Sequence, residues 1–350
     1  MAVTPLSIGN ELLSTTMHIV MKEWRDNIYT STALLDAQTR VHGEGQPTQA
    51  GGTRIVVPLG FGEHSNTTKM STGYERIDLS VEDVFQPAVY DFGHVVRPVA
   101  ISAEEEMTNQ GDAAVLSILE NRVTSVANAL KREYVKHIVQ GGVANWDDWN
   151  TLNGIGSDTT NGYLENAAAG SGSQDSSVGG VSKATFSSKT GWNNQFFDIA
   201  DSFNSNGLAG LYDLMVEINA VSAQGNPNVI LASRAGFKNL KRALQASERY
   251  MDEKSIDGGK MSTTFQGVPI DVEYYMPNAG TSSATTEASF YFLNMNDIYT
   301  LWDPKGYFDL SDFETVSGEY DVRAAKLRCR GQLIAKHLGS SALAVNGDTF

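Results

Sequence analysis

The feature that most constrains the fold is an uninterrupted stretch, residues 112–140, that contains neither glycine nor proline. Its apolar residues recur at spacings of three and four, which places them on one face of an α-helix. They are Leu116, Leu119, Val123, Val126 and Leu130. Such a helix would extend about 43 Å, farther than the width of an ordinary compact domain. It must therefore lie along something extended.

Local signals mark both ends of this helix. Ser102 and Glu105 have the spacing of a capping box, so a short helical turn is predicted there, with a pause at residues 109–111 and a restart at Asp112. Gly141 and Gly142 should end the helix. The three consecutive carboxylates at residues 104–106 thus fall in a helical first turn, where they favour the helix dipole and need no catalytic role.

The net charge of the chain limits the classes of molecule that it can bind nonspecifically. The 350 residues include 26 basic and 41 acidic residues, and the net charge of −15 opposes nonspecific binding to nucleic-acid phosphates and anionic membranes. Cys329 is the only cysteine, so no intrachain disulfide can form. Because the sequence has neither a signal-peptide pattern nor a stretch of transmembrane length, it predicts a soluble cytoplasmic product with no membrane partner.

An N-terminal arm is predicted over residues 1–52. Residues 9–29 carry apolar side chains at helical spacing, Trp24 among them, and a glycine-containing flexible stretch follows at residues 42–52. So short an arm can bury little of its apolar face locally. It packs either on another subunit or on its own body, and the sequence leaves both open.

A long β-hairpin is predicted over residues 54–101. Its two strands are predicted at TRIVVPLGFG and VYDFGHVVRPVAIS, and the polar tip between them contains Lys69. Pro58 and Pro98 each remove a backbone donor, which an edge strand or a free-standing ribbon tolerates. Because an isolated two-stranded ribbon is marginally stable in water, this one should rest on a partner surface, most simply another chain.

The rest of the sequence, from residue 142 onward, predicts a mixed α+β fold. Residues 142–206 are rich in glycine, serine and asparagine, which is typical of a functional or contact loop. An αβα unit follows over residues 207–250, with Ser233 as the cap of its second helix. Further β runs lie near residues 265–274 and 289–293.

The closing strand, residues 326–336, has two contrasting faces. One face is apolar and holds Leu327, Cys329, Leu333 and Ala335. The other is basic and polar and holds Lys326, Arg328, Arg330, Gln332 and Lys336. Three interpretations of this basic stripe remain open: a contact with a neighbour's carboxylates, the lining of a DNA-filled cavity, and a solvated strand face.

Motifs for catalysis and cofactor binding fail on inspection. The sequence around Lys260 lacks two essential residues of a phosphate loop, because Lys254 and Met261 occupy their positions. No dinucleotide-binding G-x-G-x-x-G follows a strand, and no G-x-S-x-G elbow is present. The histidines lack metal-ligand spacing, and the acidic residues at 303–321 lack the calcium-loop pattern. We therefore predict no catalytic residue, no cofactor and no metal site.

Loose apolar and glycine patterns follow one another in a recognisable order. They are GGTRIVVPLGFG from Gly51, VRPVAISAEEEMTNQGDAA from Val96, SVGGVSKATFSSKTGWNN before residue 195, NPNVILASRAGFKNL from Asn226, FQGVPIDV from Phe265, FYFLNMNDIYTL from Phe290 and RGQLIAKHLGSSALA from Arg330. Their collinear order resembles the major capsid proteins of tailed bacteriophages, whose fold is named after phage Hong Kong 97 (HK97). The resemblance covers nearly the whole chain.

The resemblance implies an α+β, HK97-like capsid fold. Residues 1–52 would be the N-terminal arm, 53–101 the extended β-hairpin loop, 102–205 and 310–350 the peripheral domain with its spine helix, and 206–309 the axial α+β domain. The implied function is structural, not enzymatic: self-assembly through pentamers and hexamers into the icosahedral head shell enclosing double-stranded DNA of a tailed phage. The expected location is the virion, after synthesis in the bacterial host cytoplasm.

The resemblance also implies partners and assembly residues. No scaffold-like segment precedes the arm, so a separate scaffolding protein is expected, with a portal and, as a further candidate, a decoration protein. Packaged DNA should make only loose nonspecific contact with an acidic inner wall. The candidate assembly residues are Lys326, Arg328 and Arg330 of the stripe, Lys69 near the loop tip, and Trp24 of the arm. Some relatives cross-link through a loop lysine, but the sequence identifies no acceptor for Lys69.

Two alternatives stay open. An encapsulin-type compartment shell has the same fold, but the long glycine- and serine-rich insertion suits a phage shell better than the usually shorter encapsulins. A soluble α+β enzyme would need a site that converges only in three dimensions. The missing motifs, the ribbon and the arm count against that enzyme.

Overall fold

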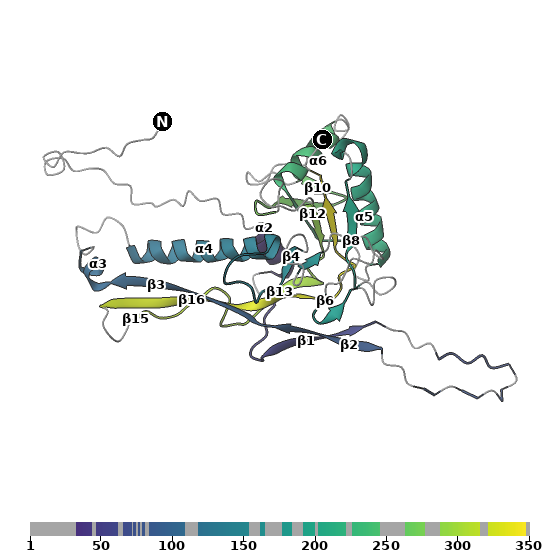
Figure 1. The fold of residues 1–350 in the computed structure, drawn as a ribbon, viewed down its shortest axis with the longest axis horizontal. Coiled ribbons are helices and arrows are strands. Elements are labelled where there is room, and N and C mark those ends of the chain that lie inside the picture. The colour runs from purple at the N-terminus through teal and green to yellow at the C-terminus, as the bar shows by residue number, and fades with distance from the viewer. Residues whose placement is uncertain are drawn as a thin grey trace.

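The chain folds around two larger β-sheets, each with its own helices (Figure 1). The computed structural model describes residues 33–43, 47–61, 66–71, 73–74, 76–77, 79–80, 84–108, 118–153, 162–164, 177–183, 192–199, 202–221, 226–245, 263–276, 288–315 and 321–347. Helices and strands both contribute to it, which confirms the predicted α+β class. No helix within these residues has the length and apolar character needed to cross a membrane.

The predicted spine helix is present as α4, Ile118–Gln140. Residues 112–117, at its predicted start, lie outside the described residues. The helix ends at Gln140, and the next residue, Gly141, has a φ of +77° that is unfavourable for a residue with a side chain. Before it lies α3, Ala103–Thr108, so the predicted turn is confirmed as a separate short helix.

The sheet beside α4 is organised by one long strand, β16, Val322–Ala335. It pairs antiparallel with β3, Gly93–Ser102, along most of its length. Its other edge pairs with β13, Ile298–Trp302, and with the short strands β14, Asp309–Leu310, and β15, Glu314–Thr315. Figure 1 shows α4 lying along β3 and β16. This sheet is the extended support that the length of the helix requires.

The predicted hairpin is confirmed over only part of its range. Strands β1, Arg54–Gly60, and β2, Phe85–Asp91, form a two-stranded antiparallel ribbon in which Pro58 lies opposite Pro87. No other described strand joins this ribbon, as the prolines predicted. The predicted continuation to residue 101 is wrong, because β3 leaves the ribbon and pairs with β16 instead.

The second sheet has six strands in the order β10-β11-β9-β12-β17-β8. In that order they span Thr263–Phe265, Val268–Val272, Val229–Ala232, Ala288–Leu293, Ala342–Val345 and Gln195–Asp198. The π-helical turn η3, Phe203–Gly207, leads into α5, Leu208–Val221, and α6 spans Arg234–Gln245. The predicted αβα unit is confirmed, with the Gly236 amide donating to the Ser233 hydroxyl over 3.0 Å at the expected cap.

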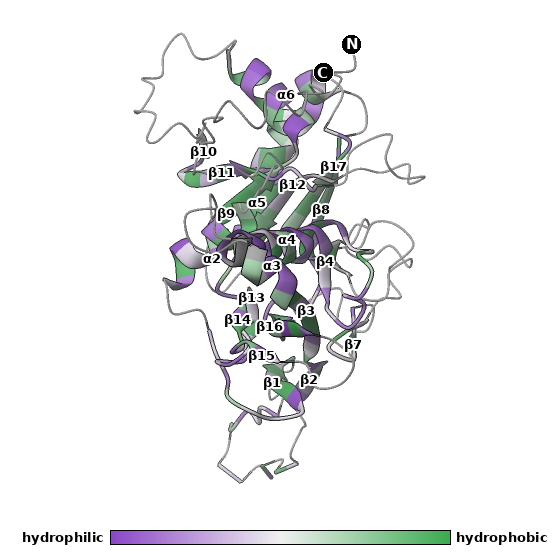
Figure 2. Cartoon of the chain, turned by 90° about the vertical axis from the view of Figure 1, so that its left-hand side faces the viewer, coloured by the Kyte–Doolittle hydropathy of each residue, from purple (hydrophilic) through white to green (hydrophobic). Residues whose placement is uncertain are grey.

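The two faces of the six-stranded sheet belong to two different cores. On one face, Ile230, Ile270 and Phe290 pack with residues of α5 and α6. On the other, Leu231 and Tyr291 belong to the core that includes the C-terminal end of α4, and the Tyr291 hydroxyl donates to the Val139 carbonyl over 3.2 Å. Figure 2 shows these largely hydrophobic strands between the helices. The end of the spine helix therefore ties the two sheets together.

Sheet membership departs from the predicted domain boundaries. Strands β8 and β17 lie outside residues 206–309, yet they pair parallel to each other in the six-stranded sheet. Strand β13 lies inside that range, yet it pairs with β16 in the other sheet. The closing segment, predicted to return wholly to the peripheral domain, therefore contributes to both sheets, because β17 fills the position between β12 and β8.

The described part of the arm packs on its own body. Helix α2, Ala33–His42, buries Leu34 and Ala37, and the Gln38 side-chain amide nitrogen donates to Thr300 Oγ1 over 3.1 Å. Within the stretch predicted to be flexible, the Gln49 amide donates to the Trp302 carbonyl over 2.9 Å. The predicted helix at residues 9–29, with Trp24, lies outside the described residues, so its packing stays a prediction.

The predicted contact loop at residues 142–206 contributes to the core where it is described. Trp146, Trp149 and Trp192 are all buried. Four short strands lie between them: β4, Thr151–Asn153, β5, Gly162–Leu164, β6, Ser177–Val178, and β7, Val181–Ser182. The rest of this stretch, including most of the glycine- and serine-rich insertion, lies outside the described residues.

Candidate assembly surfaces

One face of the β1–β2 ribbon is anchored to the body of the same chain. Ile55, Leu59 and Tyr90 are buried, and the Tyr90 hydroxyl donates to the Ala335 carbonyl over 2.9 Å. The turn between β6 and β7 supports the ribbon, because the Val89 amide donates to the Gly179 carbonyl over 2.9 Å. A Cβ at residue 179 would lie 2.7 Å from the Ala88 Cβ, so only glycine permits this approach. The base of the ribbon is therefore fixed in direction.

The rest of the ribbon exposes large apolar side chains. Val56, on the strand β1 itself, is 58% exposed, and Phe85, at the distal end, is 74% exposed. The connecting loop exposes Tyr74, Ile77 and Leu79, at 96%, 57% and 84%. Figure 1 shows the ribbon projecting away from both sheets. Several large apolar side chains exposed on one projecting segment are typical of a protein–protein contact.

The predicted polar tip also carries these exposed apolar residues. The loop is polar in average composition, but its apolar members have no neighbour within the described part of the chain that buries them. The signal was present in the sequence as tyrosine, isoleucine and leucine between polar residues. Lys69, predicted near the tip, is exposed there, and its role in assembly stays a prediction.

The basic stripe on β16 divides into two parts. Lys326 and Arg328 are exposed, and Arg328 lies between Val96 of β3 and Asp309 of β14 in the sheet register. Arg330 is bound within its own chain: its guanidinium donates to the Asp303 carboxylate over 2.7 Å and to the Gly52 carbonyl over 3.2 Å. It also lies 4.8 Å from the centre of the Phe92 ring.

Gln332 corrects the predicted stripe. The strand alternation predicts Gln332 on the polar, open face, but its side chain is buried. The Gln332 side-chain amide nitrogen donates to the Asp91 and Asp148 backbone carbonyls over 2.7 and 2.8 Å. The Gln332 side-chain oxygen accepts from the Asn150 backbone N–H over 2.8 Å. Chain segments from the ribbon and the Trp149 region therefore cover this end of the strand. Within β16 the open part of the stripe is limited to Lys326 and Arg328. Lys336, the first residue after β16, is also exposed, and its Nζ lies 4.9 Å from the centre of the Tyr299 ring.

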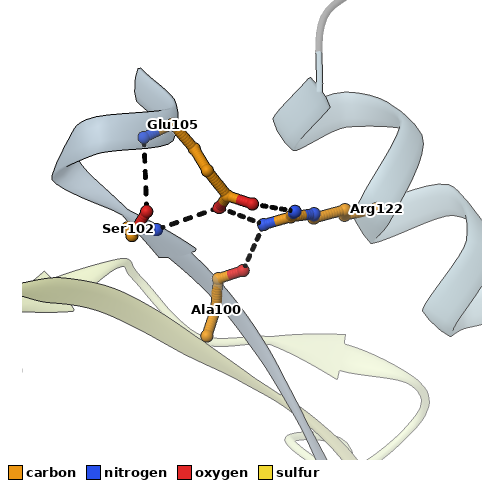
Figure 3. Close-up of polar contacts among 4 residues, drawn as sticks. All are labelled: Ala100, Ser102, Glu105 and Arg122. Atoms are coloured by element: carbon orange, nitrogen blue, oxygen red, sulfur yellow. Dashed lines mark hydrogen bonds and ion pairs between the residues drawn. The ribbon is translucent and has the colours of Figure 1, made fainter. Parts of the chain in front are cut away.

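A polar cluster fixes the start of the spine region (Figure 3). The Glu105 amide donates to Ser102 Oγ and the Ser102 amide to the Glu105 carboxylate, each over 3.2 Å, which is a complete capping box. Arg122 of α4 donates two hydrogen bonds to the same carboxylate, over 2.8 and 2.6 Å, and one to the Ala100 carbonyl over 2.9 Å. The cluster thus joins α3, α4 and β3.

Arg122 also lowers the pKa of the Glu105 carboxyl group in this cluster. Its hydrogen bonds to Glu105, followed by the bond from the Ser102 amide, lower the pKa of Glu105 from its ordinary 4.5 to about 2. A carboxyl group with a lowered pKa stabilises the fold above its ordinary pKa, and that contribution is lost as the pH falls from about 4.5 through 2.

We expect Glu105→Gln to remove this acid dependence. At pH 7 the variant should melt at a lower temperature than the parent, and the difference should shrink as the pH falls toward 2, because the parent then loses the same charge. Thermal melts followed by circular dichroism between pH 7 and 2 would measure it. Glu104→Gln is the neighbouring control. A difference that stays constant over this pH range would contradict the role of the Glu105 charge.

The described residues contain no group of three or more His, Cys, Asp or Glu side chains placed to hold a metal ion. The buried Cys329 thiol has a raised pKa because burial disfavours the thiolate. His137 is also buried, and its Nε2 lies 2.9 Å from the Trp149 carbonyl oxygen.

No family model matches the sequence, and no curated protein matches it. Solved structures do match its fold over nearly its full length. The capsid of cyanophage A-1(L) superposes with a TM-score of 0.65 at 14% identity, over 98% of this chain and 99% of that one. The capsid of an empty GTA particle gives 0.61 at 10% identity, over 99% and 100%.

The structure of an encapsulin also matches the fold of this chain. The SrpI encapsulin complex from Synechococcus elongatus PCC 7942 matches with a TM-score of 0.56 at 10% identity, over 99% of this chain and 97% of that one. The likeness thus includes both phage capsids and an encapsulin, and at these identities it concerns the fold. With its projecting ribbon, spine helix and two sheets, this chain has the HK97-like capsid fold.

Proposed function

We propose that this chain is a shell-forming structural protein, the major capsid protein of a tailed phage. The observation that carries the proposal is the ribbon: its base is fixed to the body, while its outer part exposes Tyr74, Ile77, Leu79 and Phe85. Such a surface gains most by burial against another copy, because apolar burial is worth about 25 cal/mol per Å². The full-length match to phage capsid structures supports the same function.

On this proposal the chain is not an enzyme and acts by repeated self-association. Pentamers and hexamers would build an icosahedral head shell around double-stranded DNA, with a scaffolding protein, a portal and a decoration protein as candidate partners. Closed symmetry adds many modest contacts, so each can be weak. The net charge of −15 supports loose contact with packaged DNA. The shell would form in the host cytoplasm and become part of the virion.

The test is the state of the full-length chain in solution. It would be expressed alone and with a candidate scaffolding protein, then examined by sedimentation and negative-stain microscopy. Shells or regular sheets of megadalton mass are the expected result. A monodisperse monomer or dimer in both conditions would overturn the proposal.

An encapsulin-type shell is the second candidate, and the match to the SrpI complex favours it enough to be tested. The contents of purified particles separate the two functions. Nuclease-protected double-stranded DNA, acquired with a packaging machinery, would support the phage shell. A protein cargo held by a short peptide, in particles free of DNA, would support the encapsulin.

The open part of the basic stripe is proposed to meet carboxylates of a neighbouring copy. We expect Arg328→Ser to leave the free energy of unfolding within about 0.5 kcal/mol of the parent, because Arg328 is exposed, and to lower the yield of shells. Arg330→Ser should instead destabilise the chain by about 1–3 kcal/mol, because it removes the charged partner of the nearly buried Asp303.

Urea unfolding and sedimentation of both variants would measure these effects. An unchanged shell yield for Arg328→Ser would leave the stripe a solvated strand face. The Arg330 variant controls for effects on folding, since it changes the same residue type two positions along the same strand.

A further inference from the structure

Helix α5 has an acidic ridge on its exposed side. Asp213 and Glu217 are both exposed and lie four residues apart, so they are neighbours on one helix face. Neither carboxylate forms an ion pair with any residue in the described part of the chain. Two like charges at this spacing oppose helix formation by a few tenths of a kcal/mol. The fold therefore keeps an uncompensated negative ridge here.

Helix α6 has the opposite charge. It carries a basic ridge in which Arg234, Lys238 and Arg242 are exposed and Lys241 is partly exposed, and the helix contains no acidic residue. Arg234, Lys238 and Arg242 follow one another at intervals of four, so they too are like-charged neighbours. Arg234 lies 5.6 Å from the centre of the Tyr274 ring, whereas Lys238 and Lys241 make no ion pair with a described residue.

Both ridges lie on the same helical layer. The two helices cover one face of the six-stranded sheet, and both belong to the same apolar core. In Figure 1, α5 stands at the right of this sheet and α6 lies above it, at the top of the molecule. They are thus two different surfaces of one domain with complementary charge. When α5 of one copy faces α6 of a second copy, the acidic ridge of the first pairs with the basic ridge of the second.

Apolar side chains adjoin the acidic ridge and would complete such a contact. Val216 is 65% and Tyr212 43% exposed on α5, next to Asp213 and Glu217. The Tyr212 ring is held 4.9 Å from that of Phe265, centre to centre, so it is positioned before any contact forms. An interface with an apolar centre and a charged rim has the composition expected of a specific contact.

We infer that adjacent copies join head to tail, with the acidic ridge of α5 in one copy against the basic ridge of α6 in the next. The contact uses two different surfaces, so it is heterologous, and repeated rotation closes it into a ring. It rests on the proposed shell function and identifies one contact within its rings. Because exposed charges carry it, salt weakens it as the screening length falls from about 10 Å at 0.1 M to 3 Å at 1 M.

Charge reversal in the full-length chain tests the pairing. Asp213→Lys with Glu217→Lys places cations opposite cations, and Lys238→Glu with Lys241→Glu places anions opposite anions. Each double variant is expected to lower the yield of rings and shells at least tenfold at 0.1 M salt. A chain with all four changes should restore most of the yield. Asp147→Lys with Asp148→Lys makes the same change in net charge as the Asp213 and Glu217 double variant, at other exposed positions, and should assemble normally.

Mixing the two double variants gives a second, sharper readout. In a mixed ring the lysines of one chain face the glutamates of the other only if the two chains alternate. Alternation is possible in a ring with an even number of copies, so hexamers should reappear in the mixture while pentamers should not. Negative-stain class averages and native mass spectrometry of the mixture would count the copies.

The outcomes separate this inference from the proposed function. If the parent chain forms no shells, sheets or rings in either expression condition, the proposed function fails and the contact fails with it. If the parent assembles and both double variants assemble equally well, only the α5–α6 contact is overturned. Failure of the fourfold variant to recover, with circular dichroism equal to that of the parent, would also overturn it.

Discussion

A chain carrying Tyr74→Ser, Ile77→Ser and Leu79→Ser should fold normally and fail to form shells. All three side chains are exposed, so their removal costs the isolated chain little. In an assembly each apolar side chain that becomes fully buried contributes about 1.5–3 kcal/mol, and about 1.4 kcal/mol is a factor of ten in a binding constant. Every ribbon in the shell loses this contribution, so the yield should fall below detection.

The measurement is sedimentation of the expressed chain, with circular dichroism to confirm that it is folded. The matched control is Tyr74→Phe with Ile77→Val and Leu79→Met, which changes the same positions and keeps them apolar. It should assemble at close to the parent level. Shells at full yield from the serine variant would show that the ribbon does not contribute the main contact.

The parts of the fold that the sequence could predict are those whose signals are local. The end of the spine helix at Gly141, the Ser102–Glu105 capping box and the Ser233 cap each depend on residues within a few positions of one another. Helical periodicity and capping chemistry are properties of short segments, so they can be interpreted without knowing the tertiary structure.

The parts that were missed depend on contacts distant in sequence. Strand β3 has the pattern of a continued hairpin, but Val95 lies opposite Cys329, a residue whose position no local rule supplies. Strand β17 likewise joins the six-stranded sheet by parallel pairing with β8, so Leu343 lies opposite Phe196. A strand's own alternation says which face is buried but does not say which strand will be its neighbour.

The assembly surfaces show the same division. The alternation of β16 correctly placed Lys326 and Arg328 on an open face. It could not reveal that Asp303 binds Arg330 or that Gln332 is covered, because those partners approach from other segments of the chain. The exposed apolar tip was readable in principle, since a soluble loop has little reason to carry leucine and isoleucine without a surface to bury them.

Trp302→Ala should cause the largest loss of stability of any single change considered for the folded chain. The Trp302 ring is fully buried, and its centre lies 5.2 Å from that of Tyr134, 5.5 Å from that of Trp149 and 5.5 Å from that of Phe308. These rings join the spine helix to β13 and the loop after α4. Truncating a buried tryptophan costs about 3–5 kcal/mol, a large part of the 5–15 kcal/mol that stabilises a typical domain.

Urea unfolding should be measured in the Tyr74, Ile77 and Leu79 serine background, so that self-association does not add to stability. Two variants test whether packing is the cause. Trp302→Phe keeps most of the volume and removes an indole N–H that has no hydrogen-bond partner among the described residues, so its cost should be well below that of alanine. Tyr307→Ala removes an exposed ring from the same cluster and should also cost little. Equal losses for all three variants would mean that the cluster does not hold the two parts of the core together.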